Sequence, residues 1–192
     1  FYKYVIIENP QELRDALFAQ WSQWDCLGRI YVSREGINAQ MNVPQHHWDA
    51  FDAFIHGIEY FHDVPFKLAV TDKTEGKSFL KLVVKVREQI VADGLQPEDY
   101  DVTDVGAHLT AKDWNEAIEK HDPVVVDMRN HYESEIGHFE GAVLPEAETF
   151  REELPMVLEK LKGQEDRKIL LYCTGGIRCE KTSAYLKHHG FN

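Results

Sequence analysis

One feature restricts the fold of this sequence most: an apolar segment that leads directly into a cysteine, two glycines and a helix-forming stretch. Leu170 to Tyr172 are predicted to end a buried strand, Cys173 follows, and Gly175 and Gly176 precede the helical segment. A strand that passes to a helix through a short loop is typical of α/β domains with parallel sheets, whose ligand sites lie at the carboxyl ends of the strands. We therefore expect Cys173 to lie at such a site.

The residues that follow Cys173 predict an ionised thiol. Free backbone N–H groups and the dipole at a helix N-terminus favour an anion, so a thiol there has a pKa below its ordinary value. Glycines tolerate positive φ, which lets loop amides turn toward the sulfur, and Arg178 adds a fixed positive charge. A buried structural cysteine is the alternative, but it requires none of these neighbours. We expect Cys173 to be catalytic and the surrounding anion- or sulfur-binding loop to comprise Thr174, Gly175, Gly176, Ile177 and Arg178.

Charge and cysteine content exclude several classes of protein. The 192 residues carry a formal charge of −12, divided as −3 in residues 1–96 and −9 in residues 97–192. Such acidity disfavours broad nonspecific nucleic-acid binding and membrane-surface binding. Three cysteines form no even-numbered disulfide framework, and no signal peptide or long apolar span is present, so we expect a cytoplasmic protein. Because the chain starts at Phe1 and stops just after a predicted helix, we also expect that part of the natural protein lies outside it.

The hydrophobic pattern predicts two domains, one α+β and one α/β. Residues 1–92 show the order β-α-β-β-α-β, which is ferredoxin-like (acylphosphatase-like). Residues 93–109, rich in acids, Gly and Pro, are expected to be a linker. Residues 110–192 alternate helices with strands, which predicts a parallel-sheet domain that is incomplete at its C-terminus. The strands expected in the first domain are residues 2–7, 28–33, 37–43, 66–70 and 79–86, and its helices begin at Pro10, after an Asn9 cap, and at Pro44.

Individual residues predict where the helices of the second domain begin and end. Thr110 to Asp113 form a cap for a helix that continues through Lys120. Pro155 is expected to mark a helix start within residues 149–162, and Gly190 to end the last helix. Strands are expected at residues 124–127 and 168–172.

Residues 79–87 have aliphatic side chains at every second position and mostly basic side chains between them. A strand here would place Leu80, Leu82, Val84 and Val86 on the core face and Phe79, Lys81, Lys85 and Arg87 on the other. The basic face could follow an RNA backbone while Phe79 stacks on a base. A solvated face of an antiparallel sheet explains the same pattern, and from the alternation alone we favour this explanation.

Other reactive residue types have ordinary structural explanations. Cys179 is either a thiol that resolves an oxidised or persulfidated Cys173 or a cysteine packed beneath the loop, and the spacing leaves both open. The histidine doublets lack partners at zinc-site spacing, so no metal site is predicted. Asp127 and Arg129 could be a catalytic acid and an anion binder; for Asp127 we favour a structural role at a strand end, paired with a positive charge, whereas the role of Arg129 stays open. The glycine of the Glu35-Gly36 pair is explained by a hairpin turn.

Three segments of the second half resemble the successive signatures of a rhodanese domain: Val124 to Arg129, Gly137 to Ala142 and Tyr172 to Arg178. In that family the loop cysteine accepts a sulfane sulfur as a persulfide, and the resemblance gives this role to Cys173. The resemblance gives His138 a role in setting the turn. Cysteine-dependent phosphatases have a similar architecture but a loop one residue longer, with arginine at +6. Here Arg178 is at +5, which favours sulfur over phosphate.

The first half narrows the resemblance. Gly28 to Val32 and Glu35 to Ala39, joined to the run from Cys173 to Lys181, resemble the bacterial tRNA uridine hydroxylase family called TrhO, formerly a UPF0176-type family, over essentially the whole chain. The resemblance implies oxygen-dependent conversion of wobble uridine (U34) to 5-hydroxyuridine through Cys173, with molecular oxygen as co-substrate and no predicted cofactor. Members of the family continue into a cysteine-rich extension that is absent from this sequence.

The same resemblance implies partners. tRNA is the expected substrate, and a protein that donates sulfur or electrons is a further expected partner. We expect no membrane partner. The resemblance also favours RNA binding over a merely solvated face for residues 79–87. The residues expected to bind RNA are Phe79, Lys81, Lys85 and Arg87, with Arg29 and Arg34 as further contributors.

Two other functions remain compatible with the sequence. A rhodanese-type sulfurtransferase would move sulfane sulfur through a Cys173 persulfide without any RNA. A noncatalytic module would use the same fold only to dock a partner, and its Cys173 would be unreactive toward alkylation at neutral pH.

Overall fold

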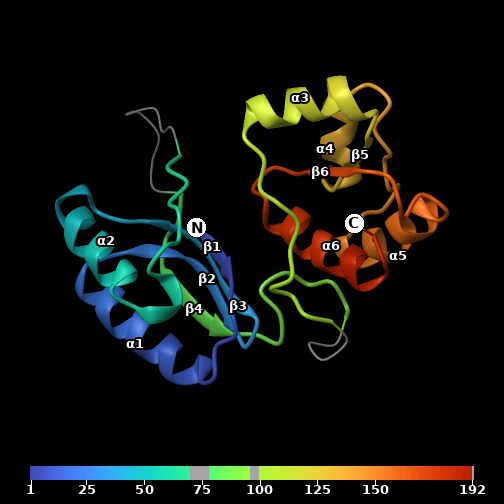
Figure 1. Cartoon of the computed structure of the whole chain (residues 1–192). Helices are drawn as coiled ribbons and strands as arrows, with labels where there is room; N and C mark the ends of the chain where they lie inside the picture. Colours follow the sequence, from blue (N-terminus) through green and yellow to red (C-terminus); the bar gives the residue numbers. More distant parts are fainter. Residues whose placement is uncertain (70–77, 96–99, 192) are drawn as a thin grey trace. The chain divides into compact units, whose positions relative to one another are not determined.

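The computed structural model describes residues 1–69, 78–95 and 100–191. The chain forms two compact units, Phe1–Ile90 and Val91–Asn192 (Figure 1). Each unit has a hydrophobic core of its own. In the described part of the chain, no helix combines the length and the apolar character that a membrane crossing requires.

The first unit is a four-stranded sheet with helices on one face (Figure 1). The strand order is β1-β3-β2-β4, in which β3 runs antiparallel to β1 and β2, while β4 runs parallel to β2. Along the chain the order of strands and α-helices is β-α-β-β-α-β, as predicted. The elements are β1 (Tyr2–Tyr4), α1 (Pro10–Gln23), β2 (Leu27–Ser33), β3 (Gly36–Asn42), the short 3-10 helix η1 (Gln45–His47), α2 (Trp48–His56), the 3-10 helix η2 (Glu59–Phe61) and β4 (Leu82–Val86).

Local signals explain the helices of this unit. The Asn9 side chain accepts the Glu12 N–H and Pro10 occupies the first turn, so α1 begins where the sequence predicts. Leu17 and Trp21 lie one helical turn apart and are fully buried against the sheet. Complete burial of such side chains contributes about 1.5–3 kcal/mol each before conformational entropy is counted.

Two strand predictions in the first unit are wrong. Residues 66–69 form no strand, although Phe66 packs against Phe1 with ring centroids 5.4 Å apart; Val70 lies outside the described residues. β4 begins at Leu82 rather than at Phe79, and Leu80 is 93% exposed instead of facing the core. The parallel pairing with β2 starts at Gly28 beside Leu82, and the Gly28 N–H bonds the Lys81 carbonyl, so Lys81 marks the beginning of the ladder with β2.

The second unit is built on two parallel strands, as predicted. Its elements are α3 (Ala111–His121), β5 (Val124–Asp127), α4 (His131–Ile136), α5 (Phe150–Leu161), β6 (Ile169–Tyr172) and α6 (Ile177–His188). Val143 adds a parallel bridge to Val126. In Figure 1, α3 lies on one side of the strands and α5 and α6 lie on the other. Their apolar side chains, including Leu154 and Leu186, form the core with β5.

Caps in the second unit follow the sequence with one exception. Thr110 forms a capping box that starts α3, and Gly190, at φ +88°, ends α6 with the hydrogen bonds of a Schellman motif. The prediction that Pro155 starts a helix is wrong, because α5 begins at Phe150 under a capping box from Thr149. Pro155 lies inside the helix, where its missing N–H removes one backbone bond.

Residues expected to form the linker are tied to α6. Asp93 and Lys181 make an ion pair in which both side chains are 1% exposed. Farther along, the Gly106 N–H donates to Ser183 Oγ at 3.0 Å, and Lys187 pairs with Asp104. The segment therefore covers α6 as part of the second unit.

Candidate active site

Cys173 lies where β6 ends and α6 is about to begin. Because β5 and β6 are parallel, this position is at the carboxyl edge of the strands, as the sequence predicts. Gly176 precedes α6 at φ +88°, a conformation that costs glycine little. This turn directs the Gly176 N–H to Cys173 Sγ at 3.0 Å.

The surroundings of Cys173 lower its pKa to about 5. The largest cause is a hydrogen bond from the Cys179 thiol to the Cys173 sulfur, and the N–H groups of Cys179, Gly176 and Gly175 add to it. Burial acts in the opposite direction and is outweighed. The pKa of Cys179 is raised, chiefly by the same hydrogen bond, so Cys179 remains a protonated donor. Cys173 is therefore a thiolate at neutral pH.

Arg178 braces the loop against α4. Its guanidinium donates to Asn130 Oδ1 at 3.3 Å and to Glu133 Oε1 at 3.1 Å. The Thr174 hydroxyl donates to the other oxygen of Glu133 at 2.5 Å. Burial alone would raise the pKa of Glu133, but Thr174 and Arg178 hold it below its ordinary value. The stabilisation of the thiolate that we expected from Arg178 thus comes mainly from Cys179 and the loop amides.

Asp127 has the structural role that we favoured. It is fully buried and accepts from Arg129 Nη2 at 2.7 Å and from the Tyr172 hydroxyl at 2.8 Å. Arg129 Nη2 also donates to the Gly137 carbonyl at 2.6 Å. Burial would raise the pKa of Asp127, but these hydrogen bonds lower it. The carboxylate therefore joins β5 and β6 to the segment that follows α4, where His138 bonds to the Ser134 carbonyl.

An aromatic cluster lies beside the loop. The rings of Trp114, Phe139 and Tyr172 are in contact, with centroids 4.9 to 6.1 Å apart. Phe139 is 46% exposed, and the Arg129 guanidinium lies 5.3 Å from the centroid of the Tyr172 ring. A Cβ added at Gly175 would meet no atom within 4 Å. Among the described residues the Cβ position of Gly175 therefore faces open space, and the aromatic cluster includes Tyr172, which directly precedes Cys173.

Glu153 is a residue of the site that the sequence did not lead us to expect. Its side chain is fully buried in α5, and neither carboxylate oxygen has a hydrogen-bond partner among the residues that the structure describes. Burial raises its pKa to about 7. The signal was present, because Glu153 lies three residues after Phe150 and four before Val157, on the apolar face of the helix.

Comparison with known proteins matches each half of the chain to a family model. Residues 1–90 match the UPF0176 acylphosphatase-like domain and residues 110–192 match the rhodanese-like domain. The chain is a UPF0176 domain joined to a rhodanese-like domain. The family resemblance that the sequence predicts is thus confirmed.

Similar proteins carry one name. Proteins named tRNA uridine(34) hydroxylase are 58% identical in Leptospira interrogans serogroup Icterohaemorrhagiae serovar Lai (strain 56601), 48% in Enterobacter sp. (strain 638) and 47% in Hamiltonella defensa subsp. Acyrthosiphon pisum (strain 5AT). Each match covers all of this chain but only 52 to 55% of the relative. The chain therefore spans about half the length of these relatives.

The open face of the UPF0176 sheet carries basic side chains. Arg29 and Tyr31 alternate with core residues of β2, and the strand register places Tyr31 beside Lys85. The Arg87 guanidinium lies 5.7 Å from the centroid of the Tyr31 ring. Lys85 and Arg87 are exposed, as is Lys81 just before β4. Tyr31 was missed, although the alternation from Arg29 to Tyr31 indicates it.

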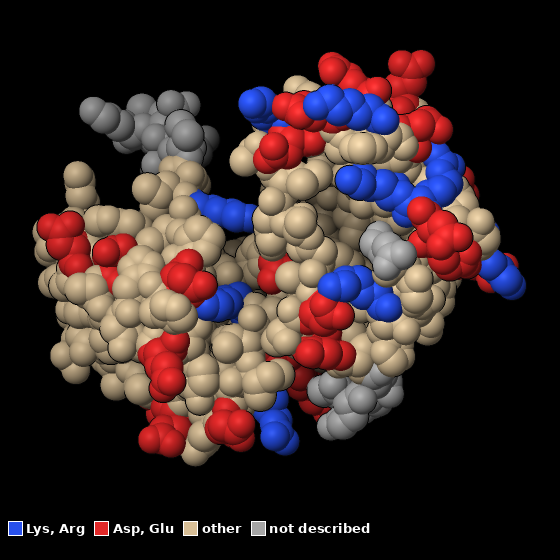
Figure 2. Space-filling view, in the orientation of Figure 1, with Lys and Arg blue, Asp and Glu red and all other residues tan. Residues whose placement is uncertain are grey.

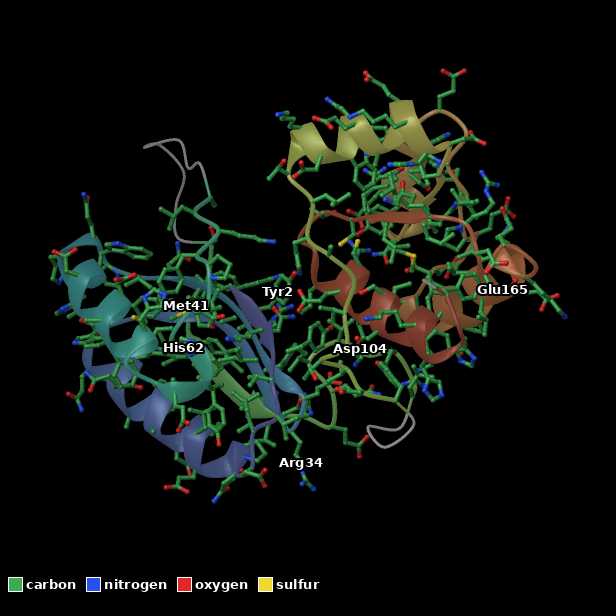
Figure 3. All side chains as sticks on the ribbon, in the orientation of Figure 1. Tyr2, Arg34, Met41, His62, Asp104 and Glu165 are labelled. Carbon is green, nitrogen blue, oxygen red and sulfur yellow. The ribbon has the colours of Figure 1, made fainter. Side chains whose placement is uncertain are left out.

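The remaining residues expected to bind RNA lie elsewhere on the UPF0176 domain. Phe79 precedes β4 and is partly buried. Arg34 lies in the turn between β2 and β3, and its side chain extends away from the ribbon (Figure 3). Glu35 Oε1 accepts the Ile90 N–H at 2.7 Å, and the Asn38 amide donates to the Ile90 carbonyl at 3.3 Å. Both therefore have structural roles.

Charges elsewhere are more mixed. Over α3 of the rhodanese-like domain, Lys and Arg side chains are interspersed with Asp and Glu (Figure 2). There Glu116 pairs with Lys112 and Lys120 one helical turn to either side. Within the described ranges, no three His, Cys, Asp or Glu side chains are grouped so that they could hold a metal ion.

Proposed function

We propose that this chain is the thiolate-bearing part of an oxidoreductase that converts wobble uridine (U34) of tRNA to 5-hydroxyuridine with molecular oxygen. The observation that carries the proposal is Cys173, whose sulfur receives hydrogen bonds from Cys179 and the loop amides and has a pKa of about 5. The name of relatives 47 to 58% identical over the whole chain supports the choice of substrate.

A thiolate can activate a pyrimidine. When sulfur adds to C6 of uracil, the C5–C6 double bond opens and its electrons move toward C5 and the C4 carbonyl, so C5 becomes the nucleophilic carbon. Loss of the C5 proton and departure of the sulfur later restore the double bond and the thiolate. The aromatic cluster beside the loop, with Phe139 partly exposed, offers a surface on which the base can stack.

Insertion of one oxygen atom sets a further requirement. Molecular oxygen delivers one atom to C5 and the other to water, which consumes two electrons and two protons. We therefore propose an electron donor protein as a partner of the enzyme. A tRNA substrate and three free cysteines fit an enzyme of the cytoplasm.

The basic face of the UPF0176 sheet is our candidate for tRNA binding. Lys81, Lys85, Arg87 and Arg29 would neutralise phosphates, and Tyr31, beneath the Arg87 guanidinium, would stack on an unpaired base. Single-stranded RNA such as an anticodon loop is recognised by this combination of cations and aromatic rings on a sheet.

Replacement of Cys173 tests the proposal directly. In a strain from which the gene encoding this chain has been deleted, we expect the full gene to restore 5-hydroxyuridine in tRNA and its Cys173→Ser variant to restore none. Mass spectrometry of tRNA nucleosides gives the result. Cys26→Ala is the matched control, because Cys26 is 2% exposed in the core of the other unit. Full modification with Cys173→Ser would exclude the thiolate from the reaction.

The loop also supports a second function. A loop that places arginine at +5 and a thiolate beneath inward-directed amides is suited to a persulfide. A sulfurtransferase without RNA would turn over thiosulfate with a thiol acceptor and would show no affinity for tRNA. Turnover without tRNA binding would favour this alternative, whereas tRNA binding with loss of modification in Cys173→Ser would favour the hydroxylase.

A further inference from the structure

Glu153 is the buried ionisable group that the proposed chemistry does not use. Its side chain has no exposed surface, and within the described ranges neither Oε1 nor Oε2 has a hydrogen-bond partner. An ionised carboxylate in such a place loses its hydration and gains no hydrogen bond in return. The carboxyl group therefore keeps its proton to a higher pH than an ordinary glutamate does.

Its neighbours connect Glu153 to the reactive loop. α5 carries Glu153 between the core residues Phe150 and Leu154, and Cys173 and Cys179 pack against the same core. Of the charged groups that act on the carboxyl, Arg178 of α6 favours its ionisation. Asp127 of β5, Cys173 and Glu133 of α4 oppose it.

The effect of Cys173 on Glu153 must be reciprocal. Two groups that interact change each other's protonation by the same free energy, so loss of the negative charge on one favours ionisation of the other. The sulfur is the neighbour whose charge changes when a covalent adduct forms, because Asp127 is held by Arg129 and Tyr172, and Glu133 by Arg178 and Thr174.

We propose that Glu153 is a proton store coupled to Cys173, protonated while the sulfur is anionic and releasing its proton when the sulfur becomes a neutral adduct. The inference deepens the proposed function, since it rests on Cys173 as the reactive thiolate. Its role is indirect, so Glu153 is a positioning residue that keeps the buried charge nearly constant when the sulfur forms or breaks a bond.

Alkylation shows the step in its simplest form. The Cys173 thiolate attacks the methylene carbon of iodoacetamide, a carbon–sulfur bond forms, and iodide leaves with the electron pair of the carbon–iodine bond. That reaction alone neither takes up nor releases a proton. In the same event the Glu153 carboxyl ionises, and its proton passes to solvent.

The first experiment measures this proton. The wild-type chain is alkylated with iodoacetamide in weak buffer at about pH 6.5, where Cys173 is ionised and Glu153 is largely protonated. We expect release of a fraction of one proton for each Cys173 alkylated and almost none from Glu153→Gln. Glu159→Gln, an exposed position on the same helix, is the matched control and is expected to behave as wild type. Equal release from wild type and Glu153→Gln would overturn the proposal, as would no release from wild type.

The second experiment needs neither a reactive sulfur nor a variant of Glu153. Carbon-13 NMR of chain labelled at the glutamate carboxyl carbons follows the titration of Glu153 in wild type and in Cys173→Ser. We expect the pKa of Glu153 to be lower in Cys173→Ser, because the anionic neighbour is gone. An unchanged titration would refute the coupling. If the titration shifts but Cys173 does not react with iodoacetamide, the proposed function fails and the coupling stands.

Discussion

At the scale of single residues, the chemistry of this chain depends on a thiol that donates a hydrogen bond to a thiolate. Cys179 remains protonated and points its S–H at Cys173, which is the largest cause of the low pKa of Cys173. A hydrogen bond to a charged acceptor is stronger than one between neutral groups. Cys179 therefore already has a role in the reduced chain, whether or not it later resolves an oxidised Cys173.

Substitution of Cys179 tests this role. Cys179→Ala removes the donor, and we expect the pKa of Cys173 to rise by about one unit, equivalent to about 1.4 kcal/mol. At pH values below the wild-type pKa of about 5, alkylation of Cys173 by iodoacetamide should slow about tenfold. Cys179→Ser keeps a donor and should retain most of the wild-type rate. Equal pH profiles for wild type and Cys179→Ala would show that the loop amides suffice.

Glu153 should make stability depend on pH. Its pKa in the folded chain, about 7, lies above its ordinary value of 4.5, so between these values the unfolded chain loses the proton first. Rising pH then favours unfolding by up to about 1.4 kcal/mol per pH unit across this window. We expect Glu153→Gln to gain stability relative to wild type as the pH rises from about 4.5 to about 7.5, measured by urea unfolding of the rhodanese-like domain.

Any cost of burying the glutamine amide in this variant is the same at every pH, so the change with pH is the informative quantity. A stability difference between Glu153→Gln and wild type that is constant across the window would contradict the assignment of a raised pKa to Glu153. Glu159→Gln, at an exposed position, serves as the control here too.

The sequence revealed part of this site and not the rest. A cysteine, two glycines and a helix start are adjacent in the chain, so the position of Cys173 and the role of the amides follow from local geometry. The hydrogen bond from the Cys179 thiol to Cys173 depends on how the first turn of α6 folds over the Cys173 sulfur. The burial of Glu153 depends on how α5 packs against a loop that lies twenty residues away. Neither depends on local sequence alone.

At the scale of secondary-structure elements, Gly36 shows how closely two strands can approach. It has φ +141°, and a Cβ there would lie 2.0 Å from the Lys3 carbonyl oxygen of β1. The turn between β2 and β3 was therefore only part of the reason for glycine. The other part is the pairing of Gly36 with Tyr4, which brings the backbone of β1 against it.

Gly36→Ala should therefore break the pairing of β1 with β3. We expect a loss of more than about 2 kcal/mol in the free energy of unfolding of the first unit, because the backbone conformation and the close approach are both unfavourable for alanine. Urea unfolding followed by tryptophan fluorescence, with Trp21 in that core, measures it. Gly137→Ala is the comparison, since its Cβ would meet no atom within 4 Å. Similar stabilities for the two variants would disprove the close approach.

Helix boundaries that are set by signals within a few residues were mostly predicted correctly. Two of the predicted strands, whose formation and extent depend on pairing with another strand, were wrong. Asn9, Thr110 and Gly190 mark helix ends through hydrogen bonds within a few residues, and the structure has each as expected. The strand expected at residues 66–70 had the right residue types, but residues 66–69 pair with no neighbouring strand. Pro155 was assigned to a helix start by its usual preference, whereas the capping box of Thr149 had already set the boundary.

At the scale of the whole molecule, an acidic chain can bind a polyanion such as tRNA only through a surface that is locally basic. The net charge is −12, and tRNA is repelled by most of such a surface. The basic face of the UPF0176 sheet is a set of exposed cations around Tyr31, whereas cations of α3 are balanced by Glu116. Binding that relies on this face must release few counterions and must therefore depend on a small number of residues.

Charge reversal at Lys81 and Lys85 tests where tRNA binds. We expect the double variant to lose most of its affinity for tRNA and to show a shallower dependence of affinity on salt, by about 0.7 to 0.9 in the logarithmic slope for each phosphate that is no longer neutralised. Lys112→Glu changes the charge in the same direction on α3, where Glu116 lies 3.8 Å from the lysine, and should weaken binding little. Filter binding at several salt concentrations measures both effects. Equal losses in the two variants would mean that net charge, rather than the sheet face, governs the affinity.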